Sequence, residues 1–302
     1  MSQTLTSIQA LENGNHFDNV TFSKGEEEGP KVTFRNNSFY IVSALLFQED
    51  KVLLVSEAKH DGKWYLPAGK VKYQESLKNA FKRELLEESS YKGEPDHLLS
   101  INAGPGGWFR FNFIGHQTGG HLKTPAEADK DTLEARWFPC SEIFNGDLNY
   151  RAQDMFEVIK DGILWNQQNG ALQREKSIIL ENSFNSFCLR PLAFDLNGAN
   201  VQLAIHHETG KVPLIRMGMY YQKVVTDFFQ KSGIQVQVLG ILAVEHSPRE
   251  DSWDGYCLNV ICKLDRENST GMSNFKWIDL DSNLSSAINK IIGTQSYVWA
   301  FK

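Results

Sequence analysis

The stretch from Gly69 to Tyr91, GKVKYQESLKNAFKRELLEESSY, constrains the fold of this 302-residue chain more than any other part. Apolar residues recur there at helical spacing, which predicts a helix from about Leu77 to Ser89 with Ser76 as its N-cap. The apolar stripe of this helix consists of Leu77, Ala80 and Phe81, with Leu85 at the edge. Glu84 and Glu88 fall on the same stripe. Because buried carboxylates are costly unless their charge is balanced, the pattern predicts a cation at this face.

Three acids of this helix have a spacing that suits a metal site. Glu84, Glu87 and Glu88 stand at positions i, i+3 and i+4, and Arg83 flanks them. Oxygen-rich clusters suit hard divalent cations such as Mg²⁺ or Mn²⁺, which usually take further ligands from substrate phosphates. The pattern therefore favours metal-assisted attack of water on phosphorus. The alternative is an ordinary solvated helix face whose acids form salt bridges.

The residues around the acids favour the metal site. The stretch matches the Nudix box, G-x5-E-x7-R-E-U-x-E-E-x-G-U, and residues 38–168 resemble a Nudix hydrolase domain. The matching positions are Gly69, Glu75, Arg83, Glu84, Leu85, Glu87, Glu88 and Tyr91. Ser90 stands where the box has its second glycine, which ends the helix with a permissive backbone. Since a left-handed serine should cost about 1 kcal/mol, we expect a slightly different turn there, with the site intact.

The resemblance implies a role for each acid. Glu84, Glu87 and Glu88 would bind Mg²⁺ or Mn²⁺ together with the backbone carbonyl of Ala68. Glu84 would orient or deprotonate the attacking water. The residues expected to act in catalysis are Glu84, Glu88 and Arg83.

Other residues of the first half would support this site. Glu75 would pair with Arg83 and brace the loop against the helix. Gly69 would be needed because the backbone approaches the acids closely there. The loop acids Glu127 and Asp129 are candidates for an extra metal ligand, with solvation as the alternative for both.

The likeness extends beyond the box, to the Nudix subfamily that dephosphorylates oxidised guanine nucleoside diphosphates such as 8-oxo-dGDP. It is carried by EAKHDGKWYLPAGK, WFRFNFIGHQTGGHLKTPAEAD and ARWFP, and in the second half by GYCLNVIC and NFKWIDLD. A purine pocket needs an aromatic platform and a few polar groups. The candidates are Trp64, Leu66, Trp108, Phe109 and Phe111, with Glu134 as the polar residue that meets the base. Core packing is the alternative for each aromatic residue.

Strand-like and helix-like runs predict an α/β fold in two domains. Residues 1–37 are polar and are interpreted as a leader. Residues 38–169 would form the Nudix domain, an α/β/α sandwich around a mixed sheet, which a helix over 151–168 closes. Residues 170–302 would form a smaller, mixed α/β domain.

The second domain is predicted to be a degenerate copy of the first. Residues 228–234 can be laid on 85–91. In that pairing Gln230 and Lys231 replace Glu87 and Glu88, so the expected copy is Nudix-like and non-catalytic.

Composition excludes several classes of protein. The net charge of −6 argues against polymeric nucleic acid as a partner, because backbone binding needs a basic surface. No apolar run is long enough to span a membrane, and the chain begins without a signal sequence. The four cysteines show no CxxC pairing, which is typical of reduced thiols. We therefore expect a cytoplasmic protein whose partner is a small-molecule nucleotide; its oligomeric state stays open.

The sequence thus predicts a metal-dependent hydrolase of phosphoanhydrides in nucleoside diphosphates. The expected reaction converts 8-oxo-dGDP or 8-oxo-GDP to the monophosphate and phosphate, which would sanitise the nucleotide pool. One alternative is a Nudix pyrophosphatase that acts on ADP-ribose or another nucleoside diphosphate linked to X. Another is a catalytically silent nucleotide-binding regulator.

Overall fold

The computed structural model describes ten parts of the chain. They are residue 23 and residues 38–104, 107–145, 148–169, 178–180, 182, 184–218, 220–248, 254–271 and 274–293. The chain divides into two compact units: the first contains residues 35–176 and 300–302, and the second contains residues 177–299 together with residues 1–34. Most of the predicted leader lies outside the described residues, but Ser23 exchanges two hydrogen bonds with Leu214 of the second unit, at 2.7 and 3.0 Å.

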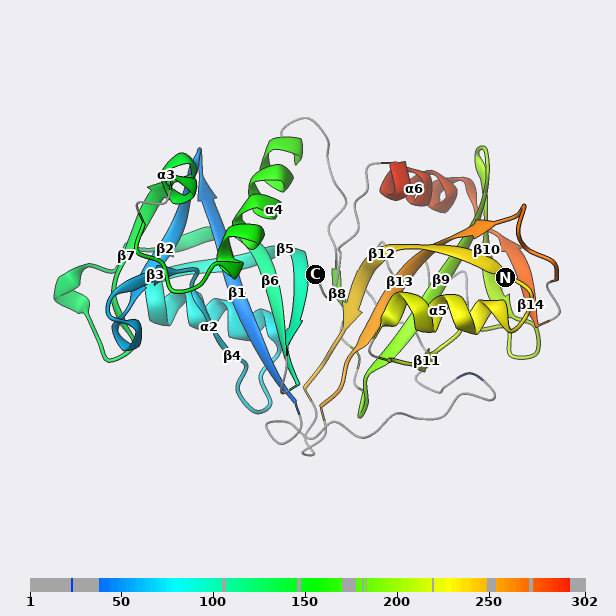
Figure 1. Cartoon of the computed structure of the whole chain (residues 1–302), viewed down its shortest axis with the longest axis horizontal. Coiled ribbons are helices and arrows are strands. Elements are labelled where there is room, and N and C mark those ends of the chain that lie inside the picture. Colours follow the sequence, from blue (N-terminus) through cyan, green and yellow to red (C-terminus); the bar gives the residue numbers. More distant parts are fainter. Residues whose placement is uncertain are drawn as a thin grey trace. The chain divides into compact units, whose positions relative to one another are not determined.

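The first unit is built on a seven-stranded mixed sheet (Figure 1). Its strands are β1 (Phe39–Gln48), β2 (Lys51–Glu57), β3 (Lys63–Tyr65), β4 (Ala68–Lys70), β5 (Tyr91–Gly104), β6 (Trp108–Gly120) and β7 (Thr132–Pro139). The order is β3-β2-β1-β6-β5, with β4 paired to β1 and β7 to β2. The β1–β6 pair is parallel and the others are antiparallel.

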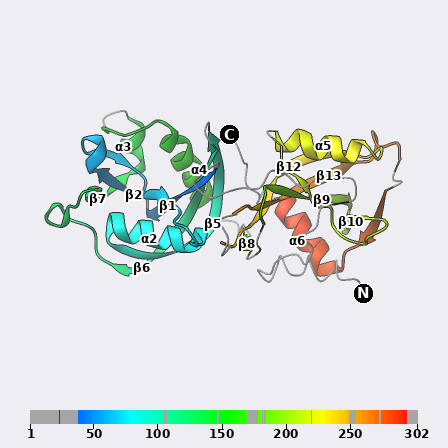
Figure 2. The same cartoon turned by 90° about the horizontal axis from the view of Figure 1, so that it is seen from below.

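Helices cover both faces of this sheet. They are α2 (Leu77–Ser89), α3 (Cys140–Phe144) and α4 (Asp154–Asn169), with short 3₁₀ turns at η1 (Ala58–His60) and η2 (Pro125–Glu127). Phe81 of α2 packs edge-to-face on Phe113, whereas Gly162 of α4 lies against Leu45 and Phe47. Figure 2 shows α2 and α4 on opposite sides of the sheet, which confirms the predicted α/β/α sandwich. The closing helix begins at Asp154, three residues after its expected start.

The ends of α2 follow from local chemistry. The Ser76 hydroxyl accepts a hydrogen bond of 3.2 Å from the N–H of Asn79, which is the capping contact its position predicts. At the other end Ser90 has φ 62° and ψ 6°, and its N–H donates to the carbonyl of Leu86 at 3.0 Å. The expectation of a different turn is therefore wrong. The serine adopts the left-handed conformation that the glycine of the box would have.

The second unit repeats the connectivity of the first. Its elements are β8 (Ile178–Leu180), β9 (Cys188–Asn197), β10 (Asn200–His206), β11 (Ile215–Arg216), α5 (Tyr221–Gln230), β12 (Gln235–Glu245), β13 (Cys257–Asp265), β14 (Phe275–Asp279) and α6 (Ser282–Gly293). β9 pairs in parallel with β13 and antiparallel with β10 and β11, as β1 pairs with β6, β2 and β4. Helices α5 and α6 lie on opposite sides of this second sheet (Figure 2).

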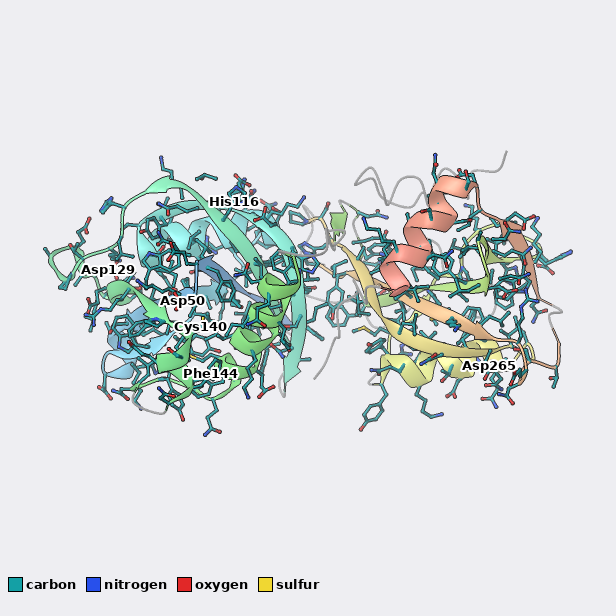
Figure 3. All side chains as sticks on the ribbon, turned by 90° about the horizontal axis from the view of Figure 1, so that it is seen from above. Asp50, His116, Asp129, Cys140, Phe144 and Asp265 are labelled. Carbon is teal, nitrogen blue, oxygen red and sulfur yellow. The ribbon has the colours of Figure 1, made fainter. Side chains whose placement is uncertain are left out.

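None of the helices in the described part of the chain has both the length and the apolar character needed to cross a membrane. The four cysteines are free thiols, and Cys140, labelled in Figure 3, is the half-buried one.

Candidate functional site

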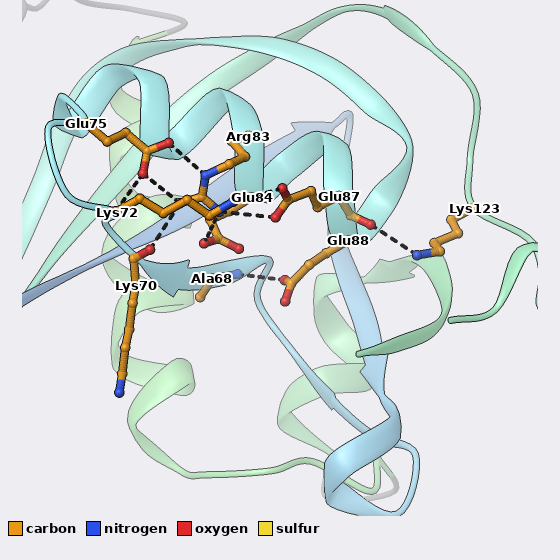
Figure 4. Close-up of polar contacts among 9 residues, drawn as sticks. All are labelled: Ala68, Lys70, Lys72, Glu75, Arg83, Glu84, Glu87, Glu88 and Lys123. Carbon is orange, nitrogen blue, oxygen red and sulfur yellow. Dashed lines mark hydrogen bonds and ion pairs between the residues drawn. The ribbon is translucent and has the colours of Figure 1, made fainter. Parts of the chain in front are cut away.

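The inward-facing acids of α2 meet the short strand β4 (Figure 4). The Glu84 carboxylate lies so close to Gly69 that a Cβ on that glycine would stand 2.2 Å from the carboxyl carbon. This contact explains why position 69 needs a glycine, because any side chain there would displace Glu84. Burial raises the pKa of Glu84, and the neighbouring Arg83 only partly offsets this effect.

Glu88 contacts the neighbouring peptide of Ala68. The Ala44 N–H donates to the Pro67 carbonyl and the Val71 N–H to the Tyr40 carbonyl, so the alternation of strand hydrogen bonds turns the Ala68 peptide away from β1. Its N–H accordingly donates to Glu88 Oε2 at 2.9 Å. Burial, reinforced by the charges of Glu84 and Glu57, raises the pKa of Glu88 to about 8.

Arg83 joins the acids to the loop before the helix. Its Nε and Nη2 donate to the two carboxylate oxygens of Glu75, both at 2.7 Å, as the box predicts. Its Nη1 donates to Glu84 at 2.5 Å and to Glu87 at 3.1 Å, and Nη2 also donates to the Lys70 carbonyl. These five bonds match the five N–H donors of a guanidinium. Burial alone would raise the pKa of Glu75, but the bonds from Arg83 and the Lys72 N–H lower it overall.

Glu87 lies at the open side of the cluster. Its side chain is 51% exposed, and Lys72 contacts it at 3.3 Å. The buried Lys123 donates to the backbone carbonyl of Glu87 at 3.0 Å and also pairs with Asp129, at 2.5 Å. This lysine therefore ties the loop before β7 to the last turn of α2.

Within the described ranges, no group of three or more His, Cys, Asp or Glu side chains converges so as to hold a metal ion. The contacts give the reason. Arg83 engages Glu84 and Glu87, while Glu88 accepts from the Ala68 peptide. The donor set still suits a hard cation, because two inward carboxylates have raised pKa values and therefore lack a full counter-charge.

The loop acids have local partners. Glu127 accepts from the backbone and hydroxyl of Thr124 and lies 2.5 Å from His121, contacts that lower its pKa to about 2. Asp129, labelled in Figure 3, accepts from Lys123 and from the N–H groups of residues 131 and 132. Both acids thus shape their own loop while staying partly exposed, at 39% for Glu127 and 48% for Asp129.

Four of the six predicted base-pocket residues do not gather on one face of the sheet. Leu66 and Phe111 are core residues, 2% and 1% exposed. Trp108 and Phe109 are adjacent on β6, so they point to opposite faces of the sheet. For Leu66 and Phe111 the structure therefore favours core packing, the alternative to a pocket.

Trp64 and Glu134 do come together. They lie on β3 and β7, each opposite Ser56 of the intervening strand β2. Arg136 connects them, since its guanidinium lies 5.3 Å from the Trp64 ring and 3.2 Å from the Glu134 carboxylate. Trp64 and Glu134 are partly buried, with Trp64 also packed on Phe138, whereas Arg136 is exposed, so the three form a partly exposed aromatic and charged surface.

A second polar group near the acids was missed from the sequence. Arg151 lies over the ring of Tyr65 at 5.1 Å, and its charge acts on Glu88. Tyr65 in turn donates to Asp154, at 3.0 and 3.1 Å, and Arg110 pairs with Asp154 at 2.7 Å. These residues come from distant segments, so no local spacing in the sequence could have revealed them.

The chain is similar in sequence to known proteins over most of its length. The NUDIX domain model matches residues 39–161. The 8-oxo-dGDP phosphatase NUDT18 of Danio rerio is 31% identical over 82% of this chain and 80% of its own length. The Homo sapiens protein of the same name is also 31% identical, over 78% of this chain and 76% of its own. A solved NUDIX hydrolase from Nitrosomonas europaea is 28% identical, with a TM-score of 0.37, and covers 42% of this chain and 90% of its own. The chain therefore belongs to the Nudix hydrolase family.

Proposed function

We propose that this enzyme hydrolyses the phosphoanhydride of a nucleoside diphosphate that carries an oxidised purine. The reaction would convert 8-oxo-dGDP or 8-oxo-GDP to the monophosphate and phosphate. Support comes from relatives named 8-oxo-dGDP phosphatase, whose similarity runs through both halves of the chain. All box acids are present, which disfavours a silent regulator.

The observation that carries the proposal is the pair of inward acids beside the Ala68 peptide. Nudix hydrolases generally need divalent metal ions. We propose that Glu84, Glu87, Glu88 and the Ala68 carbonyl hold Mg²⁺ or Mn²⁺. A bound ion would neutralise phosphate charge and lower the pKa of water. The raised pKa values of Glu84 and Glu88 support this assignment, because a cation would favour their charged forms.

The remaining residues would position this chemistry. Glu84 is proposed to orient the attacking water and take its proton, because its carboxylate is fixed against Gly69. Arg83, held by Glu75, would set the orientation of Glu84 and Glu87 through its bonds to both. Arg83 would therefore act as a positioning residue.

For the base, we propose Trp64 as the aromatic platform and Glu134 as the polar partner. Their support is the shared surface around Arg136. The oxidised purine differs from the normal base in its hydrogen-bonding edge, so a fixed carboxylate would discriminate between the two.

The test is a panel of nucleoside di- and triphosphates, normal and oxidised, together with ADP-ribose, assayed with Mg²⁺ and Mn²⁺. The highest kcat/KM is expected for the oxidised guanine diphosphates, with release of free phosphate. AMP and ribose phosphate as the main products would instead support the ADP-ribose alternative.

Variants of the acids test the metal assignment. Glu84→Gln and Glu88→Gln should each lower kcat at least about 10²-fold. The matched control is Glu94→Gln on β5, an exposed acid paired with Lys82 at 2.7 Å, which should leave kcat unchanged. An unchanged rate in Glu84→Gln would remove the proposed roles of these acids.

A further inference from the structure

We propose that Arg151 binds the diphosphate group of the substrate and that Glu57 is its positioning residue. This inference rests on the proposed function for the identity of the substrate. The choice of Arg151 as the residue that receives the diphosphate rests on the contacts in the structure alone. Neither residue belongs to the Nudix box.

The backbone holds Arg151 in place. Its N–H donates to the Trp64 carbonyl at 3.0 Å, and the Trp64 N–H donates to the Asn149 carbonyl at 2.9 Å. The segment before α4 is therefore attached to the edge strand β3. The aromatic ring of Tyr65 then supports the guanidinium from one side.

The Glu57 contact restrains one end of the guanidinium and leaves the rest open. Arg151 Nη1 donates to Glu57 Oε1 at 2.8 Å, and the Glu57 side chain is only 12% exposed. A structural Arg–carboxylate pair usually engages two nitrogens and both oxygens. Here Glu57 Oε2 is buried and accepts no hydrogen bond from any described residue. Among the described residues Glu57 alone accepts a hydrogen bond from the Arg151 guanidinium, and the Arg151 side chain is 40% exposed.

The charge balance of the site favours an anion at Arg151. A nucleoside diphosphate brings several negative charges to a cluster that already contains Glu84, Glu87 and Glu88. On the other side of the cluster, Arg83 uses its five donors and Lys123 is buried on Asp129. The half-exposed Lys72 pairs with Glu87 there, at 3.3 Å, and supplies a point charge without a guanidinium's fork of donors.

Arg151 lies over the ring of Tyr65, three residues before Ala68, whose N–H donates to Glu88 at 2.9 Å. A guanidinium with an open edge suits phosphate oxygens, which it binds through two parallel N–H donors.

The test measures binding of methylenediphosphonate, a non-hydrolysable diphosphate without a base, to the full chain with Mg²⁺ by calorimetry. Arg151→Gln should weaken binding about 10- to 100-fold, because it removes charged hydrogen bonds. Arg151→Lys should be intermediate, since it keeps the charge and loses the fork. The matched control is Arg266→Gln in the second unit, where a half-exposed arginine also pairs with a buried acid, Asp195. Its affinity should equal that of the wild type.

Two substitutions of Glu57 test its role, one that removes the hydrogen-bond acceptor and one that keeps it. Glu57→Leu removes the acceptor and should raise both the Kd and the KM about 3- to 10-fold, with kcat within about twofold. Glu57→Gln keeps an oxygen for Arg151 and should stay within about twofold of the wild type. In Arg151→Ala, added guanidinium below unfolding concentrations should restore part of the diphosphonate affinity, which a merely structural residue would not allow.

The proposal is overturned if Arg151→Gln binds the diphosphonate as tightly as the wild type, or if the wild type does not bind it. The proposed function fails by a different result, which is the absence of phosphate release from oxidised guanine diphosphates. Arg151→Gln could weaken diphosphonate binding while the wild type releases no phosphate from oxidised guanine diphosphates. That result would support the diphosphate site at Arg151 and reject the proposed substrate.

Discussion

The carboxylate of Glu84 rests on the backbone of Gly69, with no room for a Cβ between them. The observed position of the Glu84 carboxylate therefore requires a residue without a Cβ at position 69 of β4. Replacing Gly69 with alanine would displace the carboxylate by about 1 Å, because the new atom would meet it at 2.2 Å, well inside ordinary van der Waals contact. We expect kcat to fall about 10²-fold, as misplacement of a reacting group does. Steady-state kinetics with the preferred diphosphate measures this loss.

The control for this variant is Gly119→Ala. Gly119 lies on β6, and an added Cβ there would meet no heavy atom within 4 Å. Its kcat should match that of the wild type. If both alanine variants were equally active, close packing of Glu84 on Gly69 would have no part in the rate.

Ser90→Gly should stabilise the protein without changing the rate. Ser90 has φ 62°, a left-handed conformation that costs a serine about 1 kcal/mol and a glycine nearly nothing. For a unit of this size, the gain corresponds to a rise of about 2–4 °C in Tm. Thermal unfolding measures it, with Ser90→Ala as control, because alanine keeps the strain and should not raise the Tm. If Ser90→Gly were less stable than the wild type, the left-handed backbone of Ser90 would not be a source of destabilising strain.

The metal-free protein should lose stability as pH rises through neutrality. Burial raises the pKa of Glu88 to about 8 from an ordinary value of 4.5. Between these values the folded state holds a proton that the unfolded state has released, so the free energy of unfolding falls as pH increases. The loss should amount to a few kcal/mol.

Urea unfolding in a chelator at several pH values measures this dependence. Glu88→Gln should flatten it, because the amide has no proton to lose. Addition of Mg²⁺ should stabilise the wild type most at high pH. A wild type whose stability does not fall between pH 5 and 8 would exclude a buried, uncompensated Glu88.

Local spacing predicted one part of the site and missed another. The box acids and the helix from Leu77 to Ser89 follow from residues close in sequence, where helical periodicity fixes which side chains share a face. Arg151 and Glu57 meet through the fold, across 94 residues, so periodicity carries no trace of their contact. Sequence patterns also fail to distinguish core residues from pocket residues, since a sheet between two helical layers is apolar on both faces.

The second unit contains a buried ion pair whose removal should change the free energy of unfolding of that unit. Arg190 and Glu245 are both 0% exposed and are joined by bonds of 2.8 and 3.2 Å, and Asn259 also donates to Glu245. Removing one partner leaves a buried charge without its counterpart, which typically costs about 3–5 kcal/mol.

Arg190→Met should therefore lower the free energy of unfolding by that amount. Arg190→Met combined with Glu245→Leu should recover most of the loss, because replacing both charges by apolar groups restores balance.

Urea unfolding followed by a probe in the second unit checks both variants. Lys223→Gln is the matched control, since its pair with Asp227 on the surface of α5 should contribute less than about 0.5 kcal/mol. The double variant decides the point. If it is no more stable than Arg190→Met alone, the pair is not the unit's main electrostatic constraint, and the hydrogen bonds around Asn259 carry more of the stability than the charges do.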